Sequence, residues 1–374
     1  MVFLLSLACK TEITEYRVQI IEDQLSEQEY LRRLSLDIRG TLPSVEEQES
    51  FSMDALDLYL DRFFEDPNFP HRIRAIFTEY YGTVTDRHYV DYSDFNLDEQ
   101  ADFIRDIGQE PLQLLSYIAE NDLPWTEIVT ANYSLSTDFL ASTFPIEIID
   151  EHSTNKWKLA RYIDGRPLSG VLSTNSLWWR YSSTISNQNR LRANAVSTIF
   201  LCYNYLDKPL SFDRDSNLLD ENAITEAIGT DPSCVNCHRS LDPLASHLFG
   251  FWTVQRNSWL ENSLYHPERE QLWESTSGVP PEYFGQASTT LYDLGQHIAS
   301  DPRFPSCAVQ QLMSSLLVQE IDMADVQRMH KHREVFLSSN LNIKSLIRSI
   351  VTDNDYRAGQ HNPSPTGSNR KMLQ

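Results

Sequence analysis

Apolar residues recur at helical spacing along much of the chain, and helix start and stop signals flank several of these stripes. The capping box Ser26-x-x-Glu29 and the later Gly40 predict a helix that begins after Ser26 and ends at Gly40. Ser44, followed three residues later by Glu47, predicts the start of a second helix. Stripes of the same spacing predict further helices at 56–64, 73–81, 112–118 and from 124 onward.

The carboxy-terminal half contains similar stripes. The apolar segment 196–202 predicts a buried helix, and residues 290–355 predict a series of helices with stripes at 291–298, 309–321 and 343–350. Residues 359–374 are polar and rich in helix breakers, so they predict a disordered tail.

These elements predict a mainly α protein built from two helical parts. A helical amino-terminal domain is expected over residues 26–165, and a second region with the carboxy-terminal helices over 166–358. Residues 10–25 have weak strand character and predict a tether. No apolar run approaches the length of a membrane-spanning helix.

The charge balance narrows the class of partner. The 374 residues include 31 basic and 53 acidic side chains, which give a formal net charge of −22. A surface of this sign repels phosphate backbones, so nucleic acid is excluded as an expected partner and basic proteins or cations are favoured.

The strongest chemical signal is Cys234-x-x-Cys237-His238, the attachment pattern for c-type haem. Two thiols at this spacing can form thioethers to both vinyl groups of one haem, and the adjacent histidine can bind the iron as proximal ligand. The other ring nitrogen of His238 then needs a partner, which we expect to be a water or a backbone carbonyl from a turn at 242–244.

Two alternatives to haem attachment remain open. A zinc site would need two further ligands at suitable spacing, and only the isolated Cys202 and Cys307 are left to provide them. A disulfide between Cys234 and Cys237 is the other alternative.

The amino terminus is similar to the end of a bacterial lipoprotein signal. Residues 1–9 are largely apolar and end in a small residue and Cys9, whose thiol would be lipidated. The match is partial, because the stretch is short and lacks basic residues. An ordinary chain terminus with a buried cysteine, or a true start upstream, is the alternative. Since haem is attached outside the cytoplasm, we expect a bacterial protein in the periplasm or outer membrane, anchored by lipid.

The sixth iron ligand is less well specified. Met313 lies within an apolar stripe, which favours core packing, whereas Met323 follows that stripe and has more freedom to reach an iron. His247 lies on the attachment segment itself and is poorly placed for the opposite face. Three further histidines are expected on solvated helical faces: His297, His330 and His332. An iron with an open sixth position is also kept as an alternative.

Three blocks of the sequence together resemble the planctomycete-type cytochrome c proteins, a bacterial mono-haem group built from domains of unknown function. They are the amino-terminal block 31–47, the haem-bearing block from Gly170 through the C-x-x-C-H motif to Leu244, and the carboxy-terminal block 294–356. The resemblance implies a helical cytochrome c-like region with one covalent haem. The pair Ser246-His247 departs from it, since an apolar pair is usual there.

The resemblance also bears on the remaining cysteines. Both Cys202 and Cys307 coincide with cysteines of the family blocks, and they form an even pair once Cys9 is assigned to lipid and the motif to haem. We therefore expect a disulfide between them, which requires Cα atoms within about 7 Å. Two buried, unpaired thiols are the alternative.

An acidic and aromatic stretch lies between residues 86 and 106. A solvated loop and helix explain it, and a docking patch for a basic redox partner is the functional alternative.

The function expected overall is a membrane-tethered electron carrier with one haem c. An envelope interaction or assembly protein with a structural haem, and a peroxidase-like haem enzyme, remain as alternatives.

Overall fold

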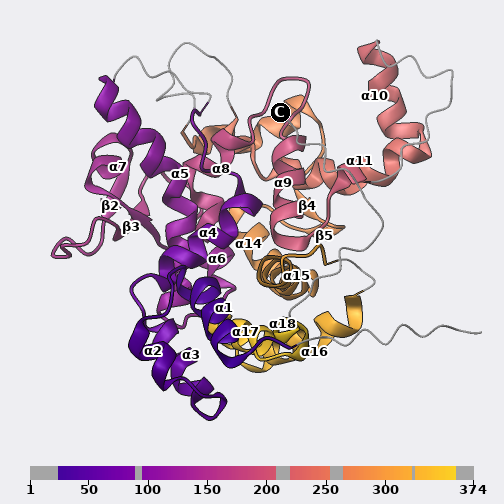
Figure 1. Cartoon of the computed structure of the whole chain (residues 1–374). Coiled ribbons are helices and arrows are strands. Elements are labelled where there is room, and N and C mark those ends of the chain that lie inside the picture. Colours follow the sequence, from indigo (N-terminus) through magenta and orange to yellow (C-terminus); the bar gives the residue numbers. More distant parts are fainter. Residues whose placement is uncertain (1–23, 89–94, 208–219, 253–263, 322–324, 359–374) are drawn as a thin grey trace, which may run out of the picture.

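The computed structural model describes residues 24–88, 95–207, 220–252, 264–321 and 325–358. The fold is mainly α, as predicted, with 63% of the described residues in helices and 6% in strands. Figure 1 shows the long helices stacked through the body, with a small sheet at one side and α10 and α11 at the other.

The bounds of the elements are as follows in the first half of the chain: α1 (Glu27–Arg39), α2 (Val45–Ser50), η1 (Met53–Ala55), α3 (Leu56–Phe64), α4 (Phe69–Tyr81), α5 (Leu97–Glu120), α6 (Glu127–Thr130), β1 (Ser134–Ser136), α7 (Asp138–Thr143), β2 (Ile146–Ile148), β3 (Lys158–Tyr162), η2 (Gly170–Ser173) and α8 (Asn175–Arg180). Those of the second half are α9 (Arg190–Leu201), η3 (Tyr205–Asp207), α10 (Glu221–Thr230), α11 (Pro232–Ser246), η4 (Phe249–Phe251), η5 (Pro267–Leu272), α13 (Trp273–Thr276), β4 (Glu282–Tyr283), β5 (Gln286–Ala287), α14 (Leu291–Ser300), α15 (Arg303–Leu317), α16 (Val326–Ser338), α17 (Ile343–Val351) and α18 (Asn354–Arg357).

The first two helices begin where the capping signals place them. Ser26 and Glu29 form the reciprocal hydrogen bonds of a capping box at the start of α1, and Gly40 ends the helix with a φ of 73°. Ser44 and Glu47 form the same box at the start of α2. These predictions are confirmed because capping depends on a few neighbouring residues.

The region from 97 to 165 differs from the prediction in two respects. Helix α5 is 24 residues long and continues through Pro111, so it includes the part of the acidic stretch from Leu97 to Asp106. The predicted helix after Pro124 is only the four-residue α6, and an antiparallel sheet with strand order β1-β3-β2 follows it. The strands have three to five residues, which is too short for an alternating pattern to stand out.

One main hydrophobic core joins the two predicted parts. It includes residues from Tyr30 to Tyr356, so the boundary proposed at 165 does not coincide with a gap in the buried core. Tyr30 in α1 donates a hydrogen bond to the carbonyl of Val351 in α17, which ties the beginning of the described chain to its end. A smaller second core lies between α5, α7 and the three-stranded sheet.

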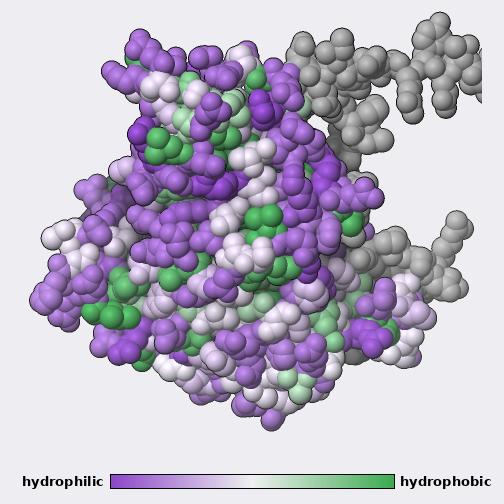
Figure 2. Space-filling model, turned by 90° about the horizontal axis from the view of Figure 1, so that it is seen from below, coloured by the Kyte–Doolittle hydropathy of each residue, from purple (hydrophilic) through white to green (hydrophobic). Residues whose placement is uncertain are grey.

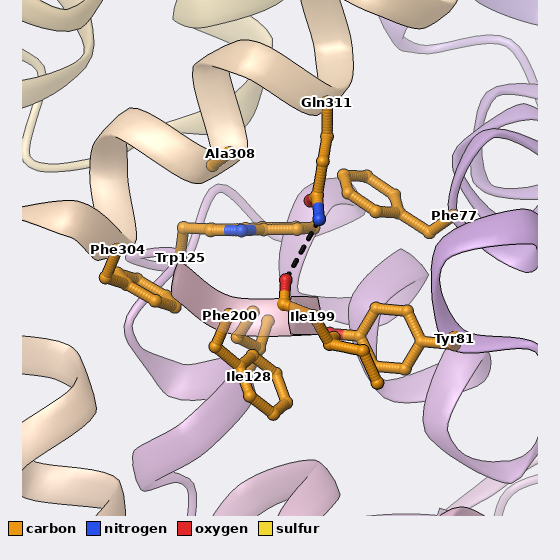
Figure 3. A pocket seen from close by; sticks show the side chains of 9 residues that line it. All are labelled: Phe77, Tyr81, Trp125, Ile128, Ile199, Phe200, Phe304, Ala308 and Gln311. Carbon is orange, nitrogen blue, oxygen red and sulfur yellow. Dashed lines mark hydrogen bonds between the residues drawn. The ribbon is translucent and has the colours of Figure 1, made fainter. Parts of the chain in front are cut away.

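Figure 3 shows where α4, α6, α9 and α15 meet in the main core. Tyr81, Trp125 and Phe304 point into a small cavity of about 10 Å³. The side-chain amide of Gln311 on α15 donates to the carbonyl of Ile199 near the end of α9, at 2.9 Å. This bond satisfies a carbonyl in the last turn of α9, where intrahelical partners are missing.

A disulfide joins the same two helices. The Cα atoms of Cys202, which caps the end of α9, and Cys307, on α15, are 5.2 Å apart, and the two sulfurs are bonded. The distance meets the geometric requirement set above. Cys202 is exposed and Cys307 is buried, so the bond is accessible from one side.

The face of the molecule drawn in Figure 2 is mostly hydrophilic. Figure 2 shows one face on which hydrophobic residues occur in small, separate groups among polar ones. None of the described helices is both long and apolar enough to cross a membrane.

We predict that reduction of the Cys202–Cys307 disulfide lowers stability substantially. The bond spans 105 residues, and in the chain-entropy model a loop of about 100 residues contributes about 4 to 5 kcal/mol, less any strain. Denaturant unfolding with and without a reductant measures the change. The double variant Cys202→Ser/Cys307→Ser is the control, because its unfolding midpoint should not respond to reductant. An equal midpoint for oxidised and reduced wild-type protein would contradict the prediction.

Candidate functional site

The C-x-x-C-H motif occupies the first half of α11. Asp231 caps this helix by accepting a hydrogen bond from the backbone N–H of Ser233 at 2.7 Å, and Pro232 stands at its first position. Cys234 and Cys237 are three residues apart on the helix and therefore share one face. The helix end that carries the motif adjoins α10 at the edge of the body (Figure 1).

Both cysteines of the motif are free thiols and are partly exposed. Cys237 packs against the edge of the main core. Burial raises the pKa of the Cys234 thiol, and the nearby Asp231 and Cys237 act in the same direction.

The imidazole of His238 is held by a carboxylate on its own helix. Nδ1 of His238 lies 2.9 Å from Oδ1 of Asp242, one helical turn further on. Since an ionised carboxylate only accepts hydrogen bonds, Nδ1 donates to Asp242, and in the neutral ring this leaves the lone pair on Nε2. Among the described residues, none forms a hydrogen bond or ion pair with Nε2.

The prediction that a backbone carbonyl or a water would hold Nδ1 of His238 was wrong. Residues 242–244 do not form a turn, because α11 continues to Ser246 with Pro243 inside it. The backbone carbonyls there belong to the helix, and the side chain of Asp242 takes the role predicted for a carbonyl. The spacing of four residues between His238 and Asp242 could have indicated this contact, because residues four apart are neighbours on a helix.

Arg190 completes the arrangement from another helix. It is the first residue of α9, and its Nε and terminal nitrogen donate to the two carboxylate oxygens of Asp242 at 2.7 and 3.0 Å. Burial alone would raise the pKa of Asp242, but hydrogen bonds from His238 and Arg190 outweigh it and lower the pKa below its usual range. No local pattern pointed to Arg190, which lies 52 residues before Asp242.

Arg192, two residues further along α9, is bonded to the ends of α8 and η4 and to the start of α9. Its guanidinium is buried and donates to the carbonyls of Trp178, Tyr181 and Phe251 and to the amide oxygen of Asn189. Burial lowers the pKa of Arg192 to about 9. The positive charge is thus held by neutral oxygens, which orient the segments on either side of α9.

The polar pair at the end of α11 connects the helix to the β4–β5 hairpin region. The hydroxyl of Ser246 donates to the carbonyl of Val279 at 2.7 Å, and Nε2 of His247 lies 2.7 Å from the hydroxyl of Ser288. Nδ1 of His247 lies 3.2 Å from the carbonyl of Leu244, so the ring nitrogens are both occupied. His247 is therefore a structural residue in the described fold.

The other candidates for the sixth ligand have different surroundings. Met313 is fully buried in the main core, as expected for core packing. Met323 lies outside the described residues. His297 stacks on Tyr283 and His330 is exposed. The prediction for His332 was wrong, because it is buried and bonded through Nδ1 to the hydroxyl of Ser349.

The residues present fit the protein's share of a c-type haem site. Two free thiols and an imidazole with an open Nε2 stand on one helix, and Asp242 fixes the imidazole tautomer. They fit zinc poorly, since Cys202 and Cys307 are bonded to each other. Within the described ranges there is also no group of three or more potential metal-ligating side chains.

Two other candidate features are only partly described. Cys9, the candidate lipidation site, lies outside the described residues, as do Asp91 and Asp94 of the acidic stretch. In the described part of that stretch, Asp98 and Glu99 occupy the first turn of α5. Asp106 is buried and paired with Lys156 at 2.6 Å, so the stretch is not wholly solvated.

No known protein family, curated protein or solved structure matches the chain.

We predict that His247 makes stability fall as the solution becomes acidic. Burial lowers the pKa of folded His247 to about 4 from 6.5, so between these values the unfolded chain takes up a proton that the folded chain does not. Stability is full above pH 6.5 and declines towards pH 4, by up to about 3 kcal/mol from this residue.

Chemical unfolding at several pH values tests this. The destabilisation caused by His247→Gln should shrink as the pH falls from 7.5 to 4.5, because the variant lacks the proton uptake. His330→Gln is the matched control, since the side chain of His330 is 68% exposed. A His247→Gln effect that is the same at both pH values would refute the prediction.

Proposed function

We propose that the protein is an exported mono-haem c-type cytochrome that carries electrons while tethered to the bacterial envelope. The observation that carries the proposal is the placement of Cys234, Cys237 and His238 on one helix, with both thiols free and Nε2 of His238 open. When bound, the haem would supply an iron that alternates between Fe(III) and Fe(II). The resemblance to planctomycete-type cytochrome c proteins agrees with this assignment.

The residues would divide the work of holding the group. Cys234 and Cys237 would provide the two thioether bonds, and Nε2 of His238 the proximal iron ligand. Asp242 holds the imidazole at Nδ1, and Arg190 holds Asp242. Partial exposure of the motif gives an incoming cofactor access to the thiols.

The disulfide supports the proposed compartment. Bonds such as Cys202–Cys307 persist in oxidising environments like the periplasm and are rare in the cytoplasm. Haem attachment to C-x-x-C-H motifs takes place in the same compartment. A lipid at Cys9 would keep the protein at the periplasmic face of a membrane, including the outer membrane.

The partner is proposed to be a basic redox protein or a basic subunit of an envelope complex. With a net charge of −22, the chain attracts positively charged surfaces at low ionic strength and repels nucleic acid. The acidic first turn of α5, at Asp98 and Glu99, belongs to this negative surface.

Two alternatives each have one supporting feature. The hydrogen bond between His238 and Asp242 makes the imidazole a stronger electron-pair donor to iron, which favours a peroxidase-like haem enzyme with an open sixth position. The core extends from Tyr30 to Tyr356, much larger than the roughly 100-residue domain an electron carrier needs, and this favours an envelope assembly protein with a structural haem.

We predict one covalent haem per chain. The chain should be produced behind an export signal, in a host with a haem-attachment system, and measured by its pyridine haemochrome spectrum and intact mass. Cys234→Ala/Cys237→Ala should yield apo-protein, because no thiol remains to form a thioether at the motif. Cys202→Ser/Cys307→Ser is a matched two-cysteine control and should retain haem. Wild-type protein without covalent haem would refute the proposal.

The spectrum also separates the three functions. A low-spin reduced spectrum with a reversible potential supports the electron carrier, whereas a high-spin spectrum that changes on addition of peroxide supports the enzyme. An assembly role is supported if deletion of the protein dissolves an envelope complex and His238→Ala does not.

A further inference from the structure

Three side chains from two helices form a hydrogen-bonded series that covalent haem attachment does not itself require. Arg190 at the start of α9 binds both oxygens of Asp242, at 2.7 and 3.0 Å, and Asp242 binds Nδ1 of His238 at 2.9 Å. The Asp242 side chain is 8% exposed and that of His238 is 23% exposed. The series is therefore shielded from water at the carboxylate and opens towards the imidazole.

The acceptor at Nδ1 determines how strongly the imidazole donates through Nε2. A carboxylate draws the Nδ1 proton more strongly than a neutral carbonyl does, so the ring becomes a more basic ligand. A more basic ligand stabilises Fe(III) relative to Fe(II). Reduction adds one electron and no proton to this group, so the negative carboxylate opposes it by charge as well.

We infer that Asp242 is a positioning residue that strengthens His238 as an iron ligand and lowers the midpoint potential of the site. The inference rests on the proposed attachment of haem at Cys234 and Cys237. A lower midpoint potential would make the reduced protein a better electron donor to acceptors of higher potential. It would make the oxidised protein a weaker oxidant of its partners.

Arg190 moderates this effect. Its bidentate contact shares the negative charge of Asp242 and leaves less of it to polarise the Nδ1–H bond. Because Oδ1 of Asp242 accepts from both Nε of Arg190 and Nδ1 of His238, the two donors compete for one oxygen. Removal of Arg190 and removal of Asp242 therefore have opposite consequences for His238.

The test is a potentiometric titration of the haem-loaded protein. Asp242→Asn should raise the midpoint potential, and Arg190→Gln should lower it. The g values of the ferric EPR spectrum should move in opposite directions as well, because they respond to the donor strength of the axial imidazole. If Asp242→Asn fails to fold, Arg190→Gln still decides the question, because a downward shift accompanied by changed g values shows polarisation of His238, whereas a downward shift with unchanged g values shows an effect of charge alone and overturns the inference.

Asp231→Asn provides the matched control for charge. Asp231 lies on the same helix, close enough to Cys234 to raise the pKa of its thiol, but it has no bond to His238. Asparagine retains the helix cap. This variant should give a smaller potential shift than Asp242→Asn and unchanged g values.

The outcomes distinguish this inference from the proposed function. Wild-type protein without covalent haem would overturn both. Haem-loaded wild-type protein whose potential is unmoved in Asp242→Asn and Arg190→Gln would overturn this inference alone. An equal shift in Asp231→Asn and Asp242→Asn, with unchanged g values in both, would also overturn it, since it would show an effect of charge without polarisation of His238.

Discussion

The attachment of α9 at three points is the constraint on which the candidate site depends. Arg190 at its start binds Asp242 of α11, Arg192 gathers three backbone carbonyls around it, and Cys202 at its end is bonded to Cys307 of α15. Each attachment crosses to a different segment of the chain. The helix that carries the C-x-x-C-H motif is therefore positioned through α9 against the rest of the core.

Arg192 shows why these attachments hold a single arrangement. A buried guanidinium without a carboxylate is costly unless its donors find acceptors, and the carbonyls of Trp178, Tyr181 and Phe251 accept from it. A shift of α9 would leave both the charge and the carbonyls unsatisfied. The penalty applies to any displacement, so it favours one conformation rather than simply adding stability.

Helix α11 combines two environments along its length. Its first half carries the partly exposed Cys234, Cys237 and His238, whereas its second half is buried and ends in the polar pair Ser246-His247. This pair is satisfied by Val279 and Ser288. The polar pair thus has a structural role at the buried end of α11, and the inner half fixes the orientation of the outer half, where a cofactor would attach.

The distribution of acidic residues follows a similar division. Buried carboxylates such as Asp106 and Asp242 are paired with basic side chains. The acidic residues outnumber the basic ones along the whole chain, which gives the net charge of −22. The interior charges therefore orient side chains, and the exposed charges give the protein a negative surface. These two roles depend on burial, which residue type alone does not reveal.

The sequence by itself determined those features that depend on neighbouring residues. The capping boxes at Ser26 and Ser44 set the helix starts, Gly40 set a helix end, and the motif placed two thiols and an imidazole together. The mainly α class followed from apolar spacing. The pairing of Cys202 with Cys307 was expected from the family resemblance and the count of cysteines, and the structure brings the two within bonding distance.

Only the tertiary structure decided which residues meet across the chain. Arg190 approaches Asp242 from 52 positions away, and His332 is buried against Ser349 although its helix has a largely polar sequence. The short strands of the β1-β3-β2 sheet are likewise stabilised by pairing between distant segments. Such contacts depend on how helices and strands pack, and packing depends on burial and on distant partners that no local pattern encodes.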